Sequence, residues 1–179
     1  MPWHPDHKAQ SRERILDTAA RLFTRHGFAG VSIDTLMQEA GLTRGAFYAH
    51  FASKSELYAE AIVTAARQGV ERLGQGTTPE ARERYLSREH LESEAGLCPL
   101  ASLVSDVAQQ DPRVRESYTR LFRGFIERAA GGEDARQRAL QRAVMMIGGL
   151  AIARTLSDEA LAEELLQACR RGVEADADR

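Results

Sequence analysis

Apolar residues recur along almost the whole chain at the three- and four-residue spacing of amphipathic helices. The first such segment ends at Gly27, and its apolar face consists of Ile15, Ala19, Leu22 and Phe23. Sustained two-residue alternation of β-branched residues, which is typical of strands, is absent from the sequence. The pattern therefore predicts an all-α fold.

Two short helices joined by a tight turn are predicted between Val31 and Phe51. Ser32 is placed to cap the first of them, and Gly41 is placed to end it because glycine tolerates a left-handed backbone. Thr43 is placed to cap the second helix by accepting a hydrogen bond from its first amides. Two short helices around a glycine-containing turn describe a helix-turn-helix, whose second helix fits the major groove of DNA.

The second helix and its continuation read Thr43-Arg44-Gly45-Ala46-Phe47-Tyr48-Ala49-His50-Phe51, followed by Ser53-Lys54. This order resembles the DNA-binding signature of the TetR family of bacterial repressors, in which Ser or Thr, Gly, Tyr, His-Phe and Lys recur at these spacings. Residues 11–28 are similar to the first helix and the glycine-aromatic turn of that family. The resemblance implies an all-helical, dimeric repressor with an N-terminal DNA-binding domain and a C-terminal ligand-binding part.

Polar residues of this segment are expected to contact double-stranded operator DNA. Arg44 lies in the first turn of the second helix, where a guanidinium can pair with O6 and N7 of guanine. Gly45 has no Cβ and lets DNA approach the backbone closely. The resemblance assigns DNA contact to the same set, which is Ser32, Thr35, Thr43, Arg44, Gly45, Tyr48, His50 and Lys54. The alternative is that these residues are ordinary helix caps and surface groups, whereas Phe47 and Phe51 are expected to be core.

Further helices are predicted after this segment. A capping box, Ser53-Lys54-Ser55-Glu56, begins a long helix that ends before the glycines at 74 and 76. Helix signals fade near Ser87. Later helices are predicted to begin at Thr78, Cys98, Asp111, about residue 134, and Ser157. The predicted division is a three-helix DNA-binding domain over residues 1–53 and a helical effector-binding and dimerisation domain over residues 54–179.

The C-terminal part is expected from the resemblance to enclose a ligand pocket. Its proposed lining combines apolar side chains with a few tyrosine hydroxyls, which indicates a hydrophobic or aromatic small-molecule effector. The proposed pocket residues are Tyr58, Ile62, Tyr85, Cys98, Leu103, Tyr118, Phe122 and Met146. The alternative is that each belongs to the core, since aromatic residues at helical spacing usually do.

Cys98 has two interpretations. At the first position of a helix its thiolate would be stabilised and its pKa lowered, which would suit a sensor of oxidants or electrophiles. The alternative, favoured because no Lys or Arg is near in sequence, is a small buried hydrophobic side chain.

A homodimer is predicted through the last two helices, because their apolar stripes exceed what one bundle needs. The predicted interface consists of Ala143, Ile147, Gly148, Leu150 and Ala151 on one helix and Leu161, Leu165, Leu166 and Cys169 on the next. The alternative is that both stripes close the core of a single protomer.

Composition adds bounds on the class of protein. The chain has 179 residues, of which 43% are hydrophobic and 28% charged, with a net charge of −2. Residues 1–54 hold seven Lys and Arg against five Asp and Glu, and residues 55–179 hold seventeen against twenty-one. A mildly basic N-terminal end on an acidic body suits a small DNA footprint, although solvated surface charge would look the same.

The chain is expected to be cytoplasmic and unattached to a membrane. Its longest apolar run, residues 143–153, is short of the roughly 20 residues that cross a bilayer. The two cysteines are expected to be free thiols, and the N-terminus lacks an apolar signal core. Neither metal nor cofactor is expected. No metal-spaced cluster, glycine-rich phosphate loop or nucleophile motif supports the alternative of a helical enzyme or ligand carrier.

Overall fold

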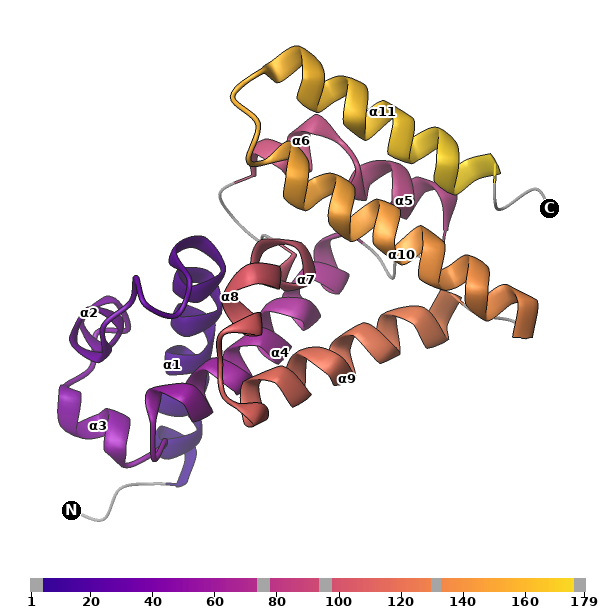
Figure 1. The fold of residues 1–179 in the computed structure, drawn as a ribbon. Helices are drawn as coiled ribbons and strands as arrows, with labels where there is room; N and C mark the ends of the chain where they lie inside the picture. The colour runs from indigo at the N-terminus through magenta and orange to yellow at the C-terminus, as the bar shows by residue number, and fades with distance from the viewer. Residues whose placement is uncertain (1–4, 74–77, 94–97, 130–132, 176–179) are drawn as a thin grey trace.

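The computed structural model describes residues 5–73, 78–93, 98–129 and 133–175, and every regular element within them is a helix (Figure 1). The all-α prediction is confirmed. The N-terminal unit contains α1 (Pro5–His26), α2 (Ile33–Glu39) and α3 (Arg44–Tyr48), and α4 (Lys54–Leu73) packs along α1. The helix-turn-helix unit, α2 and α3, lies at one end of the molecule (Figure 1).

The remaining helices form the rest of the body. They are α5 (Pro79–Tyr85), α6 (Arg88–Glu92), α7 (Pro99–Ser102), α8 (Val104–Ala108), α9 (Pro112–Ala129), α10 (Glu133–Ala153) and α11 (Glu159–Ala175). Helix α9 packs against α4 and α10, and α10 packs against α11. Helices α10 and α11 lie at the end of the molecule remote from α2 and α3 (Figure 1).

Local sequence signals place most helix ends in the N-terminal unit. The hydroxyl of Ser32 accepts a hydrogen bond from the Thr35 amide at 3.0 Å, and the turns after α1 and α2 use Gly27 (φ 68°) and Gly41 (φ 64°). The Thr43 prediction was only half right. Thr43 is the N-cap residue of α3 with an extended backbone, but its side chain makes no capping hydrogen bond.

The capping box of α4 is present, with one hydrogen-bond partner shifted by one residue. The Ser53 hydroxyl accepts from the Glu56 amide at 3.1 Å, but the Glu56 carboxylate accepts from the amide of Ala52 at 2.7 Å rather than from that of Ser53. The last helix also begins one residue later than predicted. Asp158, not Ser157, caps α11 by accepting from the Ala160 and Leu161 amides at 2.9 and 3.1 Å.

Two regions differ more from prediction. The single helix expected after Cys98 is two short helices, α7 and α8, separated at Leu103. Helix α6 was not predicted, and the Ser87 hydroxyl caps it by accepting from the His90 amide at 3.1 Å. Periodicity gives little signal for helices of four or five residues because each contributes only one or two core positions.

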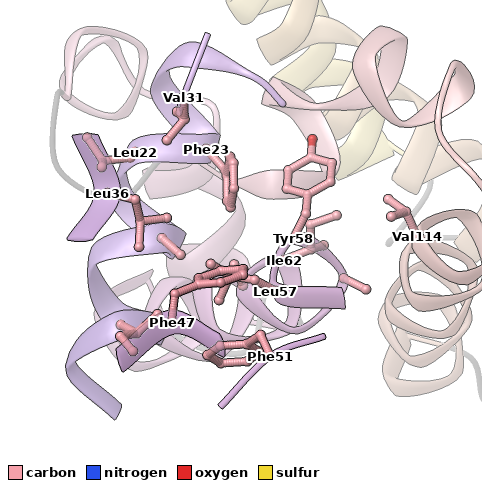
Figure 2. Close-up of a cluster of buried hydrophobic side chains, with 14 of the residues drawn as sticks. Leu22, Phe23, Val31, Leu36, Phe47, Phe51, Leu57, Tyr58, Ile62 and Val114 are labelled. Atoms are coloured by element: carbon pink, nitrogen blue, oxygen red, sulfur yellow. The ribbon is translucent and has the colours of Figure 1, made fainter. Parts of the chain in front are cut away.

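Two hydrophobic cores organise the fold. The first lies between α1, α2, α3 and the first half of α4, and it includes Phe23, Phe47, Phe51, Leu57 and Tyr58 (Figure 2). Leu103, Val107 and Val114 also belong to this core, which therefore joins the N-terminal helices to α8 and α9. The second core lies between α5, α7, α9, α10 and α11. Helix α4 begins inside the first core, so this core spans the predicted boundary between the two domains. The division between residues 53 and 54 therefore stays a prediction.

Candidate nucleic-acid interface

Helix α3 separates its side chains into a buried and an exposed face. Phe47 is fully buried, as is Phe51 just beyond the helix, and this anchors α3 to the first core. The predicted DNA contacts Thr43, Arg44 and Gly45 are exposed, and 57% of the Tyr48 surface is accessible. The structure therefore brings a tyrosine, an arginine and a glycine to one solvent face of a helix that is held from behind.

Arg44 is held by an exposed ion pair that it can exchange for another hydrogen-bond acceptor. Its Nη1 lies 2.8 and 2.7 Å from the two carboxylate oxygens of Asp34 on α2, and both side chains are exposed. Hydrogen bonds that Arg44 donates to Tyr48 and Asp34 raise the pKa of Arg44, so the guanidinium keeps its charge. Exposed ion pairs contribute little to stability. Arg44 can thus leave Asp34 for another acceptor, such as a base edge, without disturbing the fold.

Gly45 is not required by contacts within the protein. A Cβ placed there would meet only the Thr43 hydroxyl, at 3.9 Å. The space in front of the glycine is open, so its missing side chain leaves room for an external surface to approach the α3 backbone. On the neighbouring helix, the exposed hydroxyls of Ser32 and Thr35 lie 2.8 Å apart beside the first amides of α2, where a phosphate oxygen can be bound.

His50 faces α1 instead of solvent. The Ser11 hydroxyl donates to the Lys8 carbonyl at 3.0 Å, so it accepts from His50 Nε2 at 2.8 Å. Burial lowers the pKa of His50, and the charges of Lys8 and Arg12 lower it further. The predicted role of His50 as an exposed donor is therefore replaced by a neutral ring that ties the end of α3 to α1.

Lys54 also differs from its prediction as a phosphate contact. Its Nζ donates to the Phe28 carbonyl at 2.5 Å and lies 4.1 Å from the centre of the Phe28 ring. Burial lowers the pKa of Lys54, and the charge of Asp106 opposes that shift. In this conformation Lys54 fastens the turn that follows α1 to the start of α4.

Replacing Lys54 is expected to cost stability. Lys54→Met keeps most of the stem but leaves the Phe28 carbonyl without its donor, so the melting temperature should fall by roughly 2–4 °C. Lys8→Met is the matched control, since Lys8 is exposed on α1 and should melt like the wild type. Calorimetry or circular dichroism measures both. An unchanged melting temperature in Lys54→Met would mean that the Lys54 ammonium does not stabilise the fold and is available to contact DNA.

Asp106 on α8 is a site residue that sequence reasoning missed. One carboxylate oxygen accepts from the Phe28 amide at 3.2 Å, and the other accepts from the Tyr58 hydroxyl. A Cβ on Gly27 would lie 3.0 Å from the same carboxylate, so this turn needs glycine for space as well as for its positive φ. Asp106 thus links α8 to the helix-turn-helix unit through the turn after α1. A lone aspartate in a short helix gives no sequence signal for such a role.

The predicted pocket residues do not come together in one place. Tyr58, Ile62 and Leu103 belong to the first core, and Tyr85 and Met146 to the second. Cys98 and Phe122 pack at the edge of the second core, and Tyr118 touches both cores. Tyr58 is fully buried against Phe23, with ring centres 4.7 Å apart. The prediction of Tyr58 as lining is therefore replaced by a core position.

A pocket of about 320 Å³ lies elsewhere, between α5 and α11. It contains none of the predicted pocket residues; its lining is Pro79, Arg82, Glu83, Leu86, Arg170, Val173 and Glu174.

Cys98 is the N-cap residue of α7, as predicted. Burial nevertheless raises the pKa of its thiol, and neighbouring hydrogen bonds only partly oppose this. A low-pKa thiolate is therefore not supported, and the interpretation as a small packed side chain fits better. Burial also raises the pKa of Cys169, whose Sγ would lie 2.6 Å from a Cβ on Gly149. Cys169 thus marks a close approach between α10 and α11 within one protomer.

The predicted dimer residues divide between core and surface. Ala143, Ile147, Leu150 and Leu166 are buried in the second core of the protomer, as the alternative interpretation expects, and their place at a subunit interface stays a prediction. Gly148, Ala151, Leu165 and Cys169 are partly buried, and 47% of the Leu161 surface is accessible. Helix α10 also exposes Leu140, Val144 and Ile152, and the partly buried Gly148 lies in the same row; we term these four residues the exposed α10 stripe.

Other classes of site find no support in the described part of the chain. Within those residues, no group of three or more His, Cys, Asp and Glu side chains is arranged to hold a metal ion. None of the helices in the described ranges is long and apolar enough to cross a membrane.

Comparison with known proteins identifies relatives of the N-terminal unit. Residues 15–61 match the model of the bacterial regulatory proteins of the tetR family. The HTH-type transcriptional regulator AcrR of Shigella flexneri is 45% identical over 51 residues, which are 28% of this chain and 24% of AcrR. The match thus spans about a quarter of that relative. The uncharacterized HTH-type transcriptional regulator YxaF of Bacillus subtilis is 26% identical and aligns over 85% of this chain and 89% of YxaF.

Solved structures share the whole fold at low identity. A TetR-family transcriptional regulator from Cytophaga hutchinsonii superposes with a TM-score of 0.77 at 15% identity, covering 97% of this chain and 98% of that one. The reduced form of NemR from E. coli gives a TM-score of 0.73 at 19% identity, covering 93% and 96%. At these identities the similarity concerns the fold alone.

Proposed function

We propose that this chain, which belongs to the TetR family of bacterial regulatory proteins, is a sequence-specific DNA-binding transcriptional repressor that a small molecule releases from its operator. The observation that carries the proposal is the exposed face of α3, where Arg44, Gly45 and Tyr48 stand over an aromatic anchor. Its nature as a regulator rather than an enzyme, and its place in the cytoplasm with the DNA, belong to the same proposal.

Recognition is divided between bases and phosphates. Arg44 exchanges the Asp34 carboxylate for a guanine edge, and the open space at Gly45 lets α3 enter the major groove. Ser32, Thr35, Thr43 and Tyr48 bind the flanking phosphates and set the register. His50 and Lys54 act indirectly by holding α3 and the turn after α1 in place.

The active unit is a homodimer, because two recognition helices must reach half-sites about 34–36 Å apart or a multiple of that spacing. The exposed α10 stripe and Leu161 of α11 form its interface. A Cβ on Gly148 would meet nothing within 4 Å, so this position leaves room for a partner helix to approach closely.

Release from the operator follows from the contacts that hold the turn after α1 to α8. A ligand that displaces α7 and α8 moves Asp106, and with it the turn after α1 and the start of α4. A small change of this kind alters the separation of the recognition helices in the dimer. The effector must bind the DNA-incompetent state more tightly, and operator DNA must weaken effector binding by the same factor.

Selection from random duplex DNA tests the base-reading role of Arg44. Wild-type protein should enrich palindromic sites, since two-fold protein symmetry is mirrored in the operator. Arg44→Ala should lose the preference at the base pair that Arg44 reads, by roughly 10- to 100-fold in relative affinity. Arg21→Ala is the matched control, because Arg21 forms a similar exposed pair with Glu39 at 2.9 Å. Enriched sites that are identical for the wild type and Arg44→Ala would refute the assignment.

A further inference from the structure

Three polar atoms without a nitrogen or oxygen hydrogen-bond partner lie where α5, α6 and α10 meet. They are the Tyr85 hydroxyl, His90 Nε2 and Arg154 Nη1, and all three are buried. Only 5% of the Tyr85 surface and 4% of the His90 surface is accessible. The Tyr85 hydroxyl has the Cys98 thiol beside it, which is only a weak hydrogen-bonding partner. Because roughly nine in ten buried polar groups in proteins are paired, the unpaired atoms of His90 and Arg154 beside this weakly paired hydroxyl indicate a missing partner. We term these residues the buried polar cluster.

The members of the cluster are in direct contact. The Tyr85 and His90 rings meet edge to face with their centres 5.0 Å apart. Arg154 Nη2 donates to the His90 carbonyl at 2.7 Å, and Nε donates to that of Leu91 at 3.4 Å. The charge of Arg154 also acts on the pKa values of Tyr85 and His90. The three residues therefore lie side by side.

His90 presents an unpaired acceptor atom, Nε2, in the buried polar cluster. Its Nδ1 lies 2.7 Å from the Tyr85 carbonyl, which can only accept, so Nδ1 carries the proton. Burial lowers the pKa of His90 and outweighs the bond to Tyr85, and the charges of Arg154 and Arg72 act in the same direction as burial. The ring is thus neutral, and Nε2 accepts a hydrogen bond.

Arg154 presents a positive charge that no carboxylate balances among the described residues. Its Nε and Nη2 hydrogen bonds go to backbone carbonyls, and burial lowers its pKa. A buried charge is stable only when it is paired, so Arg154 Nη1 calls for an anionic or strongly accepting oxygen. Tyr85 belongs to an apolar core that also contains Leu86, Leu100, Met146 and Leu150.

We propose that the buried polar cluster binds the polar end of the effector, and that the effector is a small organic acid with an aromatic or apolar body and a hydroxyl group. Its carboxylate accepts from Arg154, its hydroxyl donates to His90 Nε2, and the Tyr85 hydroxyl completes the pairing. This inference rests on the proposed function and narrows the class of effector.

The cluster is well placed to act on DNA binding. The Tyr118 hydroxyl of α9 donates to the Leu100 carbonyl of α7 at 2.6 Å, and Tyr118 packs against both cores. Helix α8, which follows α7 directly, carries Asp106. Helix α7 therefore lies between a ligand at the cluster and α8, whose Asp106 holds the turn after α1.

Calorimetric titration of the full chain, without DNA, tests the ligand class. The probes are the three hydroxybenzoate isomers, with benzoate lacking the hydroxyl and benzyl alcohol lacking the anion. At least one hydroxybenzoate should bind, about tenfold more tightly than benzoate and at least tenfold more tightly than benzyl alcohol. Arg154→Met should weaken that binding at least tenfold, whereas Arg136→Met, an exposed arginine on α10, should not. No binding by any isomer, or equal binding to both arginine variants, would overturn the proposal.

Tyr85→Phe separates a binding role from a structural one. Removing a buried hydroxyl that has only the weak sulfur partner Cys98 should raise the melting temperature of the free protein by roughly 2–4 °C and weaken hydroxybenzoate binding several-fold. A lower melting temperature would show that the hydroxyl is already paired in the fold, which contradicts the proposal. DNA binding is measured separately on the same proteins. Loss of DNA binding with ligand binding intact refutes the proposed function, and the reverse refutes only this inference.

Discussion

Val144→Asp should convert the dimer into a folded monomer and abolish operator binding. Val144 is 64% exposed at the middle of the exposed α10 stripe, between Leu140 at 38% and Ile152 at 53%. Surface rows of large apolar side chains on adjacent turns indicate an interface. An unpaired charge buried between two protomers is strongly unfavourable, so dimerisation should weaken by at least about 100-fold. A monomer offers one recognition helix and loses the second half-site.

Sedimentation equilibrium and circular dichroism distinguish dissociation from unfolding. Val63→Asp is the matched control, since Val63 is 44% exposed on α4 and should remain dimeric. Ile147→Asp should behave differently from both. Ile147 is only 7% exposed and lies in the second core, so a charge there should unfold the protomer. A Val144→Asp protein that sediments as an intact dimer would refute the exposed α10 stripe as the interface.

Asp106→Ala should both destabilise the protein and release the turn after α1 from α8. The change leaves the buried Tyr58 hydroxyl and the Phe28 amide without an acceptor. Two such losses cost about 2–4 kcal/mol together, which lowers the melting temperature by roughly 5–10 °C. Operator affinity should fall as well, because the turn after α1 loses its link to α8.

The matched control is Ser105→Ala, an exposed neighbour on the same helix. It should melt and bind DNA like the wild type. A second variant, Tyr58→Phe, removes one of the two bonds and should show a smaller loss than Asp106→Ala. Wild-type stability in Asp106→Ala would exclude Asp106 as the link between α8 and the turn after α1.

Local chemistry in the sequence predicts much of the N-terminal unit. Ser32, Gly27 and Gly41 act within a few residues of their own position, so their roles follow from spacing alone. The burial of Phe47 and Phe51 follows from helical periodicity in the same way. All of these positions lie within residues 15–61, which match the tetR family model.

Partners distant in sequence explain what the sequence does not predict. Lys54 turns to a carbonyl 26 residues away, and His50 to a hydroxyl 39 residues away. Asp106 reaches Phe28 across 78 residues. No spacing rule connects such pairs, because tertiary packing decides which way a polar side chain turns.

Helix α10 shows a related limit. The second half of α10 carries apolar and small residues on all of its faces. Periodicity therefore cannot tell the face that enters the core from the face that remains exposed. Ile147 and Val144 are equally apolar in sequence, yet the first is buried and the second exposed. The buried polar cluster is hidden for the same reason, since Tyr85, His90 and Arg154 lie on three separate helices or their ends.

The central claim is sequence-specific DNA binding, and one titration tests it most directly. Fluorescence anisotropy compares the duplex upstream of the gene for this chain with a scrambled duplex of equal composition, over a series of salt concentrations. The account predicts binding to the native duplex at least about 1,000-fold tighter than to the scrambled one, with affinity for both falling as salt rises. Equal affinity for the two duplexes, or no binding to either, would contradict it.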